Sequence, residues 1–256
     1  MSAHRARKRF GQHFLRDPGV IDAIVSAIAP QRFDTVVEIG PGQGAITRSL
    51  AASAGVLHAI ELDRDLAARL RIEFEGNSKV TIHEADALAF DYGSLAGALR
   101  IVGNLPYNIS TPLLFALLKY REQINDMHFM LQKEVVDRMA ASPGSKAYGR
   151  LGIMLGCHFQ IDALFDVDRQ AFEPPPDVTS SVVRLAPLPA GTYEIGSEER
   201  LSRLVAQAFS QRRKTIRNSL RKVVDEATLE SVGIDPGLRP EAISIADYVR
   251  LANTLE

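Results

Sequence analysis

Residues 35–44 read Thr-Val-Val-Glu-Ile-Gly-Pro-Gly-Gln-Gly, and sequence of helical character follows them. The β-branched run Thr35–Ile39 is typical of a buried strand, and the glycines after it let the backbone turn sharply and approach a ligand closely. A strand, a glycine-rich turn and the start of a helix together indicate a binding loop for a nucleotide cofactor. Gly40, Gly42 and Ala45 also satisfy the loose dinucleotide fingerprint, so the glycines alone leave NAD and S-adenosylmethionine open.

Around this loop, from Thr35 to about Asp166, short apolar runs alternate with helical segments. Such alternation is typical of an α/β fold, a mostly parallel sheet with helices on both faces. The expected strands are Thr35–Ile39, Val56–Glu61, Val80–His83, Arg100–Gly103 and Met127–Leu131, and the expected helices between them are Ile46–Ala52, Asp65–Phe74 and Pro112–Tyr120. Ser180–Leu185 is expected to be a late strand at an edge of the sheet.

After a linker at Pro187–Thr192 the pattern is helical only. Apolar residues recur at helical spacing from Leu201 to Phe209 and again from Ile216 to Val224. We therefore expect two domains. Residues 1–188 form the cofactor-binding sheet domain with a basic N-terminal segment, and residues 189–256 form a small helical domain.

The composition is that of a folded chain. Of 256 residues, 46% are apolar and 24% are charged, and the formal net charge is −1. These values exclude a disordered or collagen-like chain, and no apolar run reaches the roughly 20 residues that a membrane span needs. Cys157 is the only cysteine, which excludes an internal disulfide and a zinc site of several cysteines. We therefore expect a cytoplasmic protein that needs no metal and contacts no membrane.

Basic residues are concentrated in two segments, residues 1–16 and 200–222, which contain no acidic residue. Two such segments in a nearly neutral chain suggest contact with a polyanion such as nucleic acid, although a basic run is often only a solvated face. The first segment could also begin a targeting peptide, but Asp17 and Asp22 argue against export. Asp17 and Pro18 instead start an amphipathic helix. The residues expected to bind the polyanion are Arg5, Arg7, Lys8, Arg9, Arg212, Arg213, Lys214, Arg217 and Arg221.

Acidic residues follow the next two expected strands. At the strand end Glu61 can accept hydrogen bonds from two ribose hydroxyls, and Asp86 can accept one from an adenine amino group. Asp63 is better explained as a helix N-cap, and a single strand-end residue such as Asp86 is commonly a turn residue. Because parallel strands end at one edge of a sheet, Gly40, Glu61 and Asp86 are expected to line one cofactor site.

Asn104-Leu-Pro-Tyr107 ends the fourth expected strand. Adenine N6 is a poor nucleophile because its lone pair is delocalised into the ring. If the Asn104 side-chain oxygen and the Leu105 main-chain carbonyl accept the two N6 hydrogens, they favour a pyramidal nitrogen whose lone pair points at a methyl donor. Pro106 fixes the backbone, and Tyr107 offers a stacking surface for a flipped base. These residue types are also common in ordinary turns, so the motif alone leaves that interpretation open.

Six stretches together resemble the ribosomal RNA adenine dimethyltransferase family in order and spacing. They are Gly11–Leu15, Glu38–Gly44, Glu61–Asp63, Asn104–Tyr107, Phe172–Val178 and Phe209–Lys214, and they span nearly the whole chain. The resemblance is closest to bacterial enzymes that dimethylate two adjacent adenosines in a hairpin loop near the 3′ end of small-subunit (16S) ribosomal RNA. It implies a class I methyltransferase Rossmann-like domain, S-adenosylmethionine as cofactor and methyl transfer to N6.

The resemblance also implies a role for each site residue. His13 and Leu15 would cover the methionine end of S-adenosylmethionine, with Gly40 beneath it, and Gly42 would bind the cofactor from the same loop. Glu61 would hold the ribose, Asp86 would hold the adenine amino group, and Asn104 would lie between cofactor and target. Family members commonly carry Asn where this chain has His13, a change that keeps a polar side chain. Phe172 is expected to stack on the second face of the target base or, alternatively, to anchor the proline-rich loop as a core aromatic.

Other functions stay open at this point. A large-subunit ribosomal RNA adenine methyltransferase of the antibiotic-resistance type shares the cofactor and Asn-x-Pro-Tyr motifs, and Phe209–Lys214 favours the small-subunit enzyme over it. A ribosome assembly factor that mainly binds RNA would use the same basic segments, and an NAD dehydrogenase is a more distant alternative. We expect the small ribosomal subunit as partner and a monomeric protein.

Overall fold

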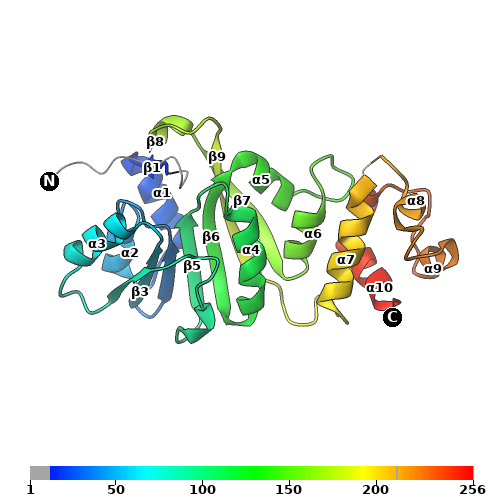
Figure 1. Ribbon diagram of the computed structural model, residues 1–256, viewed down its shortest axis with the longest axis horizontal. Coiled ribbons are helices and arrows are strands. Elements are labelled where there is room, and N and C mark those ends of the chain that lie inside the picture. The colour runs from blue at the N-terminus through cyan, green and yellow to red at the C-terminus, as the bar shows by residue number, and fades with distance from the viewer. Residues whose placement is uncertain (1–11, 212, 256) are drawn as a thin grey trace. The chain divides into compact units, whose positions relative to one another are not determined.

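The computed structural model describes residues 12–211 and 213–255 (Figure 1). Its elements are β1 (Phe14–Leu15), α1 (Pro18–Ile28), β2 (Thr35–Ile39), α2 (Thr47–Ser53), β3 (Val56–Glu61), α3 (Arg64–Glu73), β4 (Val80–Glu84), β5 (Leu99–Asn104), α4 (Ser110–Leu117), β6 (Ile124–Gln132), α5 (Lys133–Met139), α6 (Arg150–Gly156), β7 (Phe159–Val167), β8 (Phe172–Glu173), β9 (Ser180–Pro187), α7 (Glu198–Ala208), α8 (Ile216–Leu220), α9 (Glu226–Ser231) and α10 (Ile245–Asn253). The alternation of strands and helices predicted from the sequence is confirmed.

The chain divides into two compact units. The first, here called the sheet unit, comprises Met1–Val136 and Asp162–Pro187, and the second, the helical unit, comprises Asp137–Ile161 and Leu188–Glu256. The boundary after residue 188 predicted from the sequence is therefore incomplete, because residues 137–161 group with the C-terminal helices. Backbone hydrogen bonds account for this grouping, since the Gly144 N–H donates to Glu241 and the Leu188 N–H donates to His158.

The sheet has the strand order β4-β3-β2-β5-β6-β9-β7. The pairs from β4 to β6 are all parallel, whereas β9 runs antiparallel to β6, with Met127 opposite Leu185. The prediction that Ser180–Leu185 forms an edge strand is wrong, because β7 covers its outer side. The side chains of Ser181–Val183 are buried, as expected for a strand covered on both faces of the sheet.

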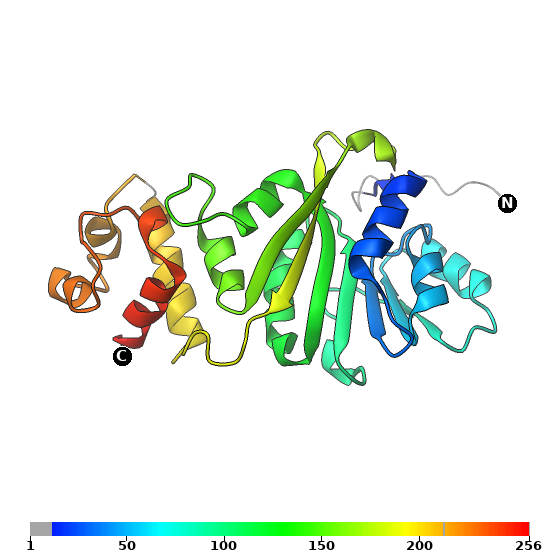
Figure 2. The ribbon, with the colours of Figure 1, turned by 180° about the vertical axis from the view of Figure 1, so that it is seen from behind.

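Helices cover both faces of this sheet. Figure 1 shows α4 in front of the sheet, and Figure 2, from behind, shows α1 on the opposite face. Asp17 caps α1 by accepting the Val20 N–H at 3.0 Å, as the sequence predicted. The buried side chains of α1 and α2 lie in one apolar cluster with Val36 and Val102 of the sheet. This packing holds the two helices against the strands whose ends line the site.

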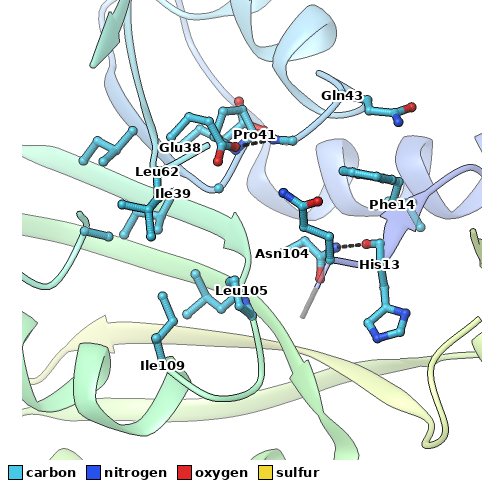
Figure 3. Close-up of a pocket in the computed structure, with 18 of the residues that line it drawn as sticks. His13, Phe14, Glu38, Ile39, Pro41, Gln43, Leu62, Asn104, Leu105 and Ile109 are labelled. Atoms are coloured by element: carbon cyan, nitrogen blue, oxygen red, sulfur yellow. Dashed lines mark hydrogen bonds between the residues drawn. The ribbon is translucent and has the colours of Figure 1, made fainter. Parts of the chain in front are cut away.

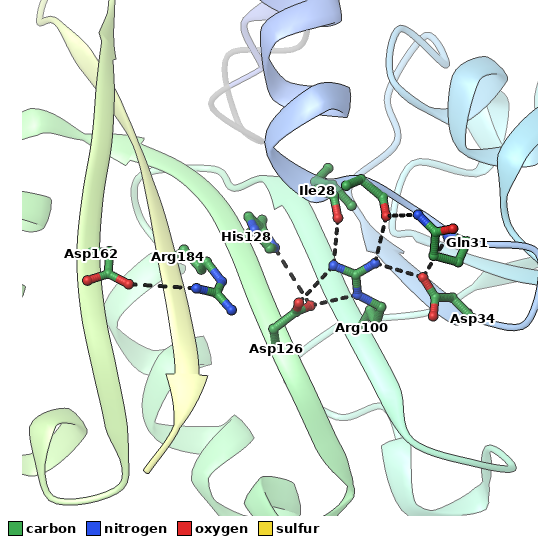
Figure 4. Close-up of polar contacts among 9 residues, drawn as sticks. Ile28, Gln31, Asp34, Arg100, Asp126, His128, Asp162 and Arg184 are labelled. Atoms are coloured by element: carbon green, nitrogen blue, oxygen red, sulfur yellow. Dashed lines mark hydrogen bonds and ion pairs between the residues drawn. The ribbon is translucent and has the colours of Figure 1, made fainter.

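A buried charge cluster lies at the amino ends of β2, β5 and β6 (Figure 4). Arg100 binds both carboxylate oxygens of Asp126, at 3.0 and 2.8 Å, and one carboxylate oxygen of Asp34 at 2.7 Å. The same guanidinium donates to the carbonyls of Ile28 and Ala29, where α1 ends. Arg100 therefore ties α1 to three neighbouring strands at the end of β5 opposite Asn104.

The helical unit follows the predicted apolar pattern in part. Leu201, Leu204 and Val205 of α7 are buried, as the spacing predicted. The second predicted stripe is only partly helical, because α8 ends at Leu220, and its C-cap is Arg221. No helix in the described part of the chain has the length and apolar content needed to cross a membrane.

Candidate active site

A cavity of about 360 Å³ lies at the carboxyl edge of the sheet unit (Figure 3). The chain segments that line it follow β2, β3, β4 and β5, and residues 12–15, here called the strap, lie along it as well. Every residue predicted to bind the cofactor lines this cavity, namely His13, Leu15, Gly40, Gly42, Glu61, Asp86 and Asn104, and so do Leu105, Pro106 and Tyr107. The structure thus brings together residues from four of the six motif stretches and Asp86.

The glycine loop turns through conformations that favour glycine. Gly40, Gly42 and Gly44 all have positive φ, between 58° and 78°. A side chain at Gly42 would come within 3.3 Å of the Phe14 ring of the strap. A side chain at this position would therefore require the Phe14 ring to move by a few tenths of an ångström, and the positive φ would add backbone strain.

Glu61 connects the glycine loop to the turn after β3. One of its carboxylate oxygens accepts the Gly42 N–H at 3.0 Å and the other accepts the Asp63 N–H at 2.9 Å. Burial raises the pKa of Glu61, and these two N–H groups counteract part of that effect. Because each oxygen has a second lone pair, the carboxylate can still accept hydrogen bonds from hydroxyls in the cavity.

Glu38 also lines the cavity, although no role is predicted for it from the sequence. Its side chain is 2% exposed, and its Oε2 has no hydrogen-bond partner within the described part of the chain. Burial raises the pKa of Glu38 to about 7, and the nearby charge of Glu61 adds to this effect. An acidic residue inside the otherwise apolar strand 35–39 was the signal that could have identified it.

The side chain of Asn104 is oriented by the strap. Its Nδ2 donates to the main-chain carbonyl of His13 at 3.2 Å, as Figure 3 shows. The opposite end of the amide is then an oxygen, Oδ1, to which the described residues donate no hydrogen bond. Asn104 therefore offers an acceptor to an amino group that enters the cavity.

Tyr107 follows in the same turn. Its ring lies nearly parallel to the His13 ring, with the centroids 6.0 Å apart and the planes inclined by 25°. The Tyr107 hydroxyl and Ser180 Oγ share a hydrogen bond of 2.9 Å. His13 in turn makes a hydrogen bond of 2.8 Å through Nδ1 to the carbonyl of Pro174. The strap, the Asn104–Tyr107 turn and the proline-rich loop thus meet at one end of the cavity.

Phe172 occupies a different place from the one predicted for a stacking aromatic. Its side chain is 3% exposed, it pairs with Leu15 between β8 and β1, and it does not line the cavity. It belongs to the apolar cluster that contains Ile24 of α1. The prediction that Phe172 faces the target base is corrected accordingly, and the alternative of a core aromatic that anchors the loop describes its position.

Two acidic residues have the local roles that the sequence allowed. Asp63 is the N-cap of α3 and accepts the Asp65 N–H. The Asp86 carboxylate accepts the Leu88 N–H at 2.9 Å in a turn. Asp86 also lines the cavity. Among the described residues, no group of three or more His, Cys, Asp or Glu is arranged to hold a metal ion.

The basic residues predicted to bind RNA are only partly within the described ranges. Arg5, Arg7, Lys8, Arg9 and Arg212 lie outside the described residues. Arg213, Lys214, Arg217 and Arg221 are exposed on the helical unit. Arg217 differs from the prediction in one respect, because its guanidinium forms an ion pair of 3.0 Å with Glu226.

Comparisons with known proteins identify the family to which the chain is similar. The sequence model of a family described as ribosomal RNA adenine dimethylase matches residues 3–256. Ribosomal RNA small subunit methyltransferase A of Dechloromonas aromatica (strain RCB) is 54% identical over 255 residues, which cover 100% of both proteins. Of the solved structures, a dimethyladenosine transferase from Plasmodium falciparum is similar with a TM-score of 0.81 and 26% identity, over 93% of this chain and 96% of that one.

A second solved structure is the 23S rRNA methyltransferase ErmE, with a TM-score of 0.75 and 27% identity over 94% of this chain and 99% of that one. The mostly parallel sheet and these structures confirm the class I methyltransferase fold predicted from the sequence. Because the family model covers nearly the whole sequence and a relative more than half identical matches it from end to end, the chain belongs to the ribosomal RNA adenine dimethylase family.

Proposed function

We propose that this chain transfers methyl groups from S-adenosylmethionine to N6 of two adjacent adenosines in a hairpin loop near the 3′ end of small-subunit ribosomal RNA. The observation that carries the proposal is the shared cavity, in which the glycine loop and Glu61 lie beside the oxygen end of Asn104. An adenine N6 methyltransferase requires a binding site for the nucleoside part of its cofactor and a hydrogen-bond acceptor for the target amino group.

The cavity fits S-adenosylmethionine in its polar groups. Glu61 presents carboxylate lone pairs to ribose hydroxyls, and the unpartnered Oε2 of Glu38 offers a further buried hydrogen-bonding atom. Asp86 lies at the end where an adenine amino group would bind, and Leu62 and Ile60 supply apolar lining. The cofactor supplies an electrophilic methyl group on a sulfonium.

The chain's contribution to the chemistry is to hold and orient the target amine. Asn104 Oδ1 and the Leu105 carbonyl accept the two N6 hydrogens, which favours a pyramidal nitrogen with its lone pair turned toward the cofactor. Tyr107 stacks on the ring and compensates part of the cost of taking the base out of its stack. Positioning and electrostatics supply the rate enhancement. The N6 nitrogen is positively charged and strongly acidic once it carries the new methyl group, so its proton passes to water and no general base is assigned.

The names of the relatives favour the small subunit. The protein that is 54% identical is named a small-subunit methyltransferase, whereas the large-subunit enzyme ErmE is 27% identical. The exposed cations Arg213, Lys214 and Arg221 of the helical unit provide contacts for RNA phosphates. Because the described residues of one chain line the cavity, we propose that the protein acts as a monomer. We further propose that it acts in the cytoplasm and without a metal ion.

The test is a methylation assay on separated small and large ribosomal subunits from cells that lack the activity. We expect N6,N6-dimethyladenosine in the small-subunit RNA, detected by mass spectrometry of its nucleosides. Labelling confined to large subunits would refute the proposal. An Asn104→Ala variant serves as control, because it should still bind the RNA but lose methyl transfer. Undiminished transfer by that variant would contradict the role of Asn104.

A further inference from the structure

Tyr107, the proposed stacking surface, is held at both ends. Its hydroxyl shares a hydrogen bond of 2.9 Å with Ser180 Oγ, and its main-chain carbonyl accepts a hydrogen bond of 3.1 Å from Ser110 Oγ. The bond at Ser110 fixes the backbone of the turn. The bond at Ser180 fixes the ring itself, because it anchors the far end of the side chain and so limits rotation about the side-chain torsions.

Ser180 is placed on a rigid part of the fold. It is the first residue of β9, its side chain is fully buried, and it pairs with Gln132 at the end of β6. The Lys133 N–H donates to the carbonyl of Thr179 at 3.0 Å and extends this pairing by one step. A hydroxyl held by a paired strand gives a more exact anchor than one on a loop.

We infer that Ser180 is a positioning residue for the target base, holding the Tyr107 ring at the orientation in which it stacks on the adenine; this inference rests on the proposed function. Stacking energy depends on the relative planes of the two rings, so a ring that rotates loses part of it. Burial raises the pKa of Tyr107, so its hydroxyl stays protonated near neutral pH and can donate to Ser180.

The neighbouring residue on the same strand offers a matched control. Ser181 is also buried, at 2% exposure, but its Oγ donates to the carbonyl of Phe165 on β7 at 3.2 Å. Successive side chains on a strand point to opposite faces of the sheet. Ser180→Ala and Ser181→Ala therefore remove the same atom from adjacent buried positions, and only the first removes the contact with Tyr107.

The experiment compares Ser180→Ala, Ser181→Ala, Tyr107→Phe and the double variant Ser180→Ala/Tyr107→Phe in the full chain. We expect Ser180→Ala and Tyr107→Phe each to lower kcat for methylation of small subunits by about threefold to tenfold, the value of one hydrogen bond. The double variant should lose no more than either single variant, because both remove the same bond. Ser180→Thr, which keeps a hydroxyl, should recover most of the rate, and the Kd for S-adenosylmethionine should not change.

A spectroscopic readout separates positioning from general stability. In a small-subunit hairpin RNA that carries 2-aminopurine at the target position, emission is quenched when the base stacks. Emission from the complex should rise with Ser180→Ala and Tyr107→Phe and stay at the wild-type level with Ser181→Ala. Losses that multiply in the double variant, or equal effects of Ser180→Ala and Ser181→Ala, would overturn the inference.

Tyr107→Phe keeps the inference testable if Ser180→Ala does not fold, because it removes the same bond and leaves β9 intact. Wild-type rate and wild-type emission with Tyr107→Phe would overturn the inference on their own. A wild-type chain that methylates no small-subunit RNA would refute the proposed function. An active wild-type chain with no difference between the two serine variants would refute only the role of Ser180.

Discussion

The side-chain amide nitrogen of Asn104 donates to the main-chain carbonyl of His13 at 3.2 Å. This bond joins the turn after β5 to the strap, and it decides which end of the amide faces an incoming amine. The strap is held on its other side as well, because Gln12 donates to Asp63 at 3.3 Å. The orientation of the amine acceptor thus depends on residues far away in the sequence.

Asn104→Asp tests this dependence. The substitution keeps one oxygen and replaces the donor Nδ2 with a second oxygen, and it places a negative charge about where Nδ2 lies, 3.2 Å from the His13 carbonyl. We expect kcat to fall about 100-fold, the size of effect seen when one preorganised polar group is lost from an active site. The Kd for S-adenosylmethionine, measured by calorimetry, should change little. An Asp variant with the wild-type kcat would show that the orientation of this amide does not matter.

Glu38 predicts a pH dependence of stability. Burial raises the pKa of Glu38 from 4.5 to about 7, so between these values the folded protein holds a proton that the unfolded chain releases. The free energy of unfolding should therefore fall as pH rises through this window, by roughly 3 kcal/mol in total from this group. A Glu38→Gln variant lacks this contribution, so its stability relative to wild type should increase from pH 4.5 to pH 8 in urea titrations. Parallel pH profiles for the two proteins would contradict the assignment.

Arg48 is expected to support the glycine loop from outside the cavity. Its guanidinium donates to the carbonyls of Gly44, at 2.9 Å, and Gln43, at 3.0 Å, and it pairs with Glu73. Arg48→Ala should raise the KM for S-adenosylmethionine about threefold to tenfold with little change in kcat. Arg71→Ala, which removes an exposed ion pair nearby, serves as control and should leave KM unchanged.

Arg100→Met should destabilise the sheet unit. It leaves the buried carboxylates of Asp34 and Asp126 without their cation, which typically costs about 3–5 kcal/mol. Urea unfolding should show this loss, and Arg203→Met, at an exposed pair with Glu199, should show almost none. At urea concentrations below the unfolding transition, the kcat of Arg100→Met should stay near the wild-type value, because Arg100 lies at the opposite end of β5 from Asn104. An unchanged unfolding midpoint would show that the cluster adds no stability.

Arg217 and Glu226 allow a test of the RNA-binding surface. Their ion pair of 3.0 Å neutralises a cation that the sequence alone assigns to RNA. Arg217→Ala should therefore weaken RNA binding less than Lys214→Ala, which should flatten the salt dependence by about one phosphate contact. Glu226→Gln releases Arg217 and should strengthen binding at low salt. Equal salt slopes for wild type and Lys214→Ala would remove that residue from the RNA contact surface.

The parallel half of the sheet could be predicted from the sequence closely. The bounds of β2 and β3 match the expectation, because each is an apolar run with a clear turn at its end. β7 was not predicted. Phe159–Asp162 alternates apolar and polar residues as a half-exposed strand does, but the apolar residues 163–165 interrupt the alternation. Without β7 to cover it, Ser180–Leu185 was predicted to lie at the edge.

The cavity was predictable where a motif ends a strand, as at Gly40, Glu61 and Asn104. The contacts that complete it depend on tertiary pairing that no local pattern reports. Phe172 is buried because β8 pairs with β1, and the Tyr107 hydroxyl meets Ser180 because β9 lies beside β6. Local spacing contains no information on either pairing.

The position of β9 late in the chain sets the order in which the parts of the sheet unit can fold while the protein is being synthesised. The glycine loop, Glu61 and Asn104 precede Ser180–Pro187 in the chain and are therefore synthesised first. Pairing of β9 with β6 then joins segments that are far apart along the chain, which is the slower kind of contact. The Tyr107 ring therefore gains its anchor at Ser180 only after β9, the last strand of the sheet along the chain, has paired with β6.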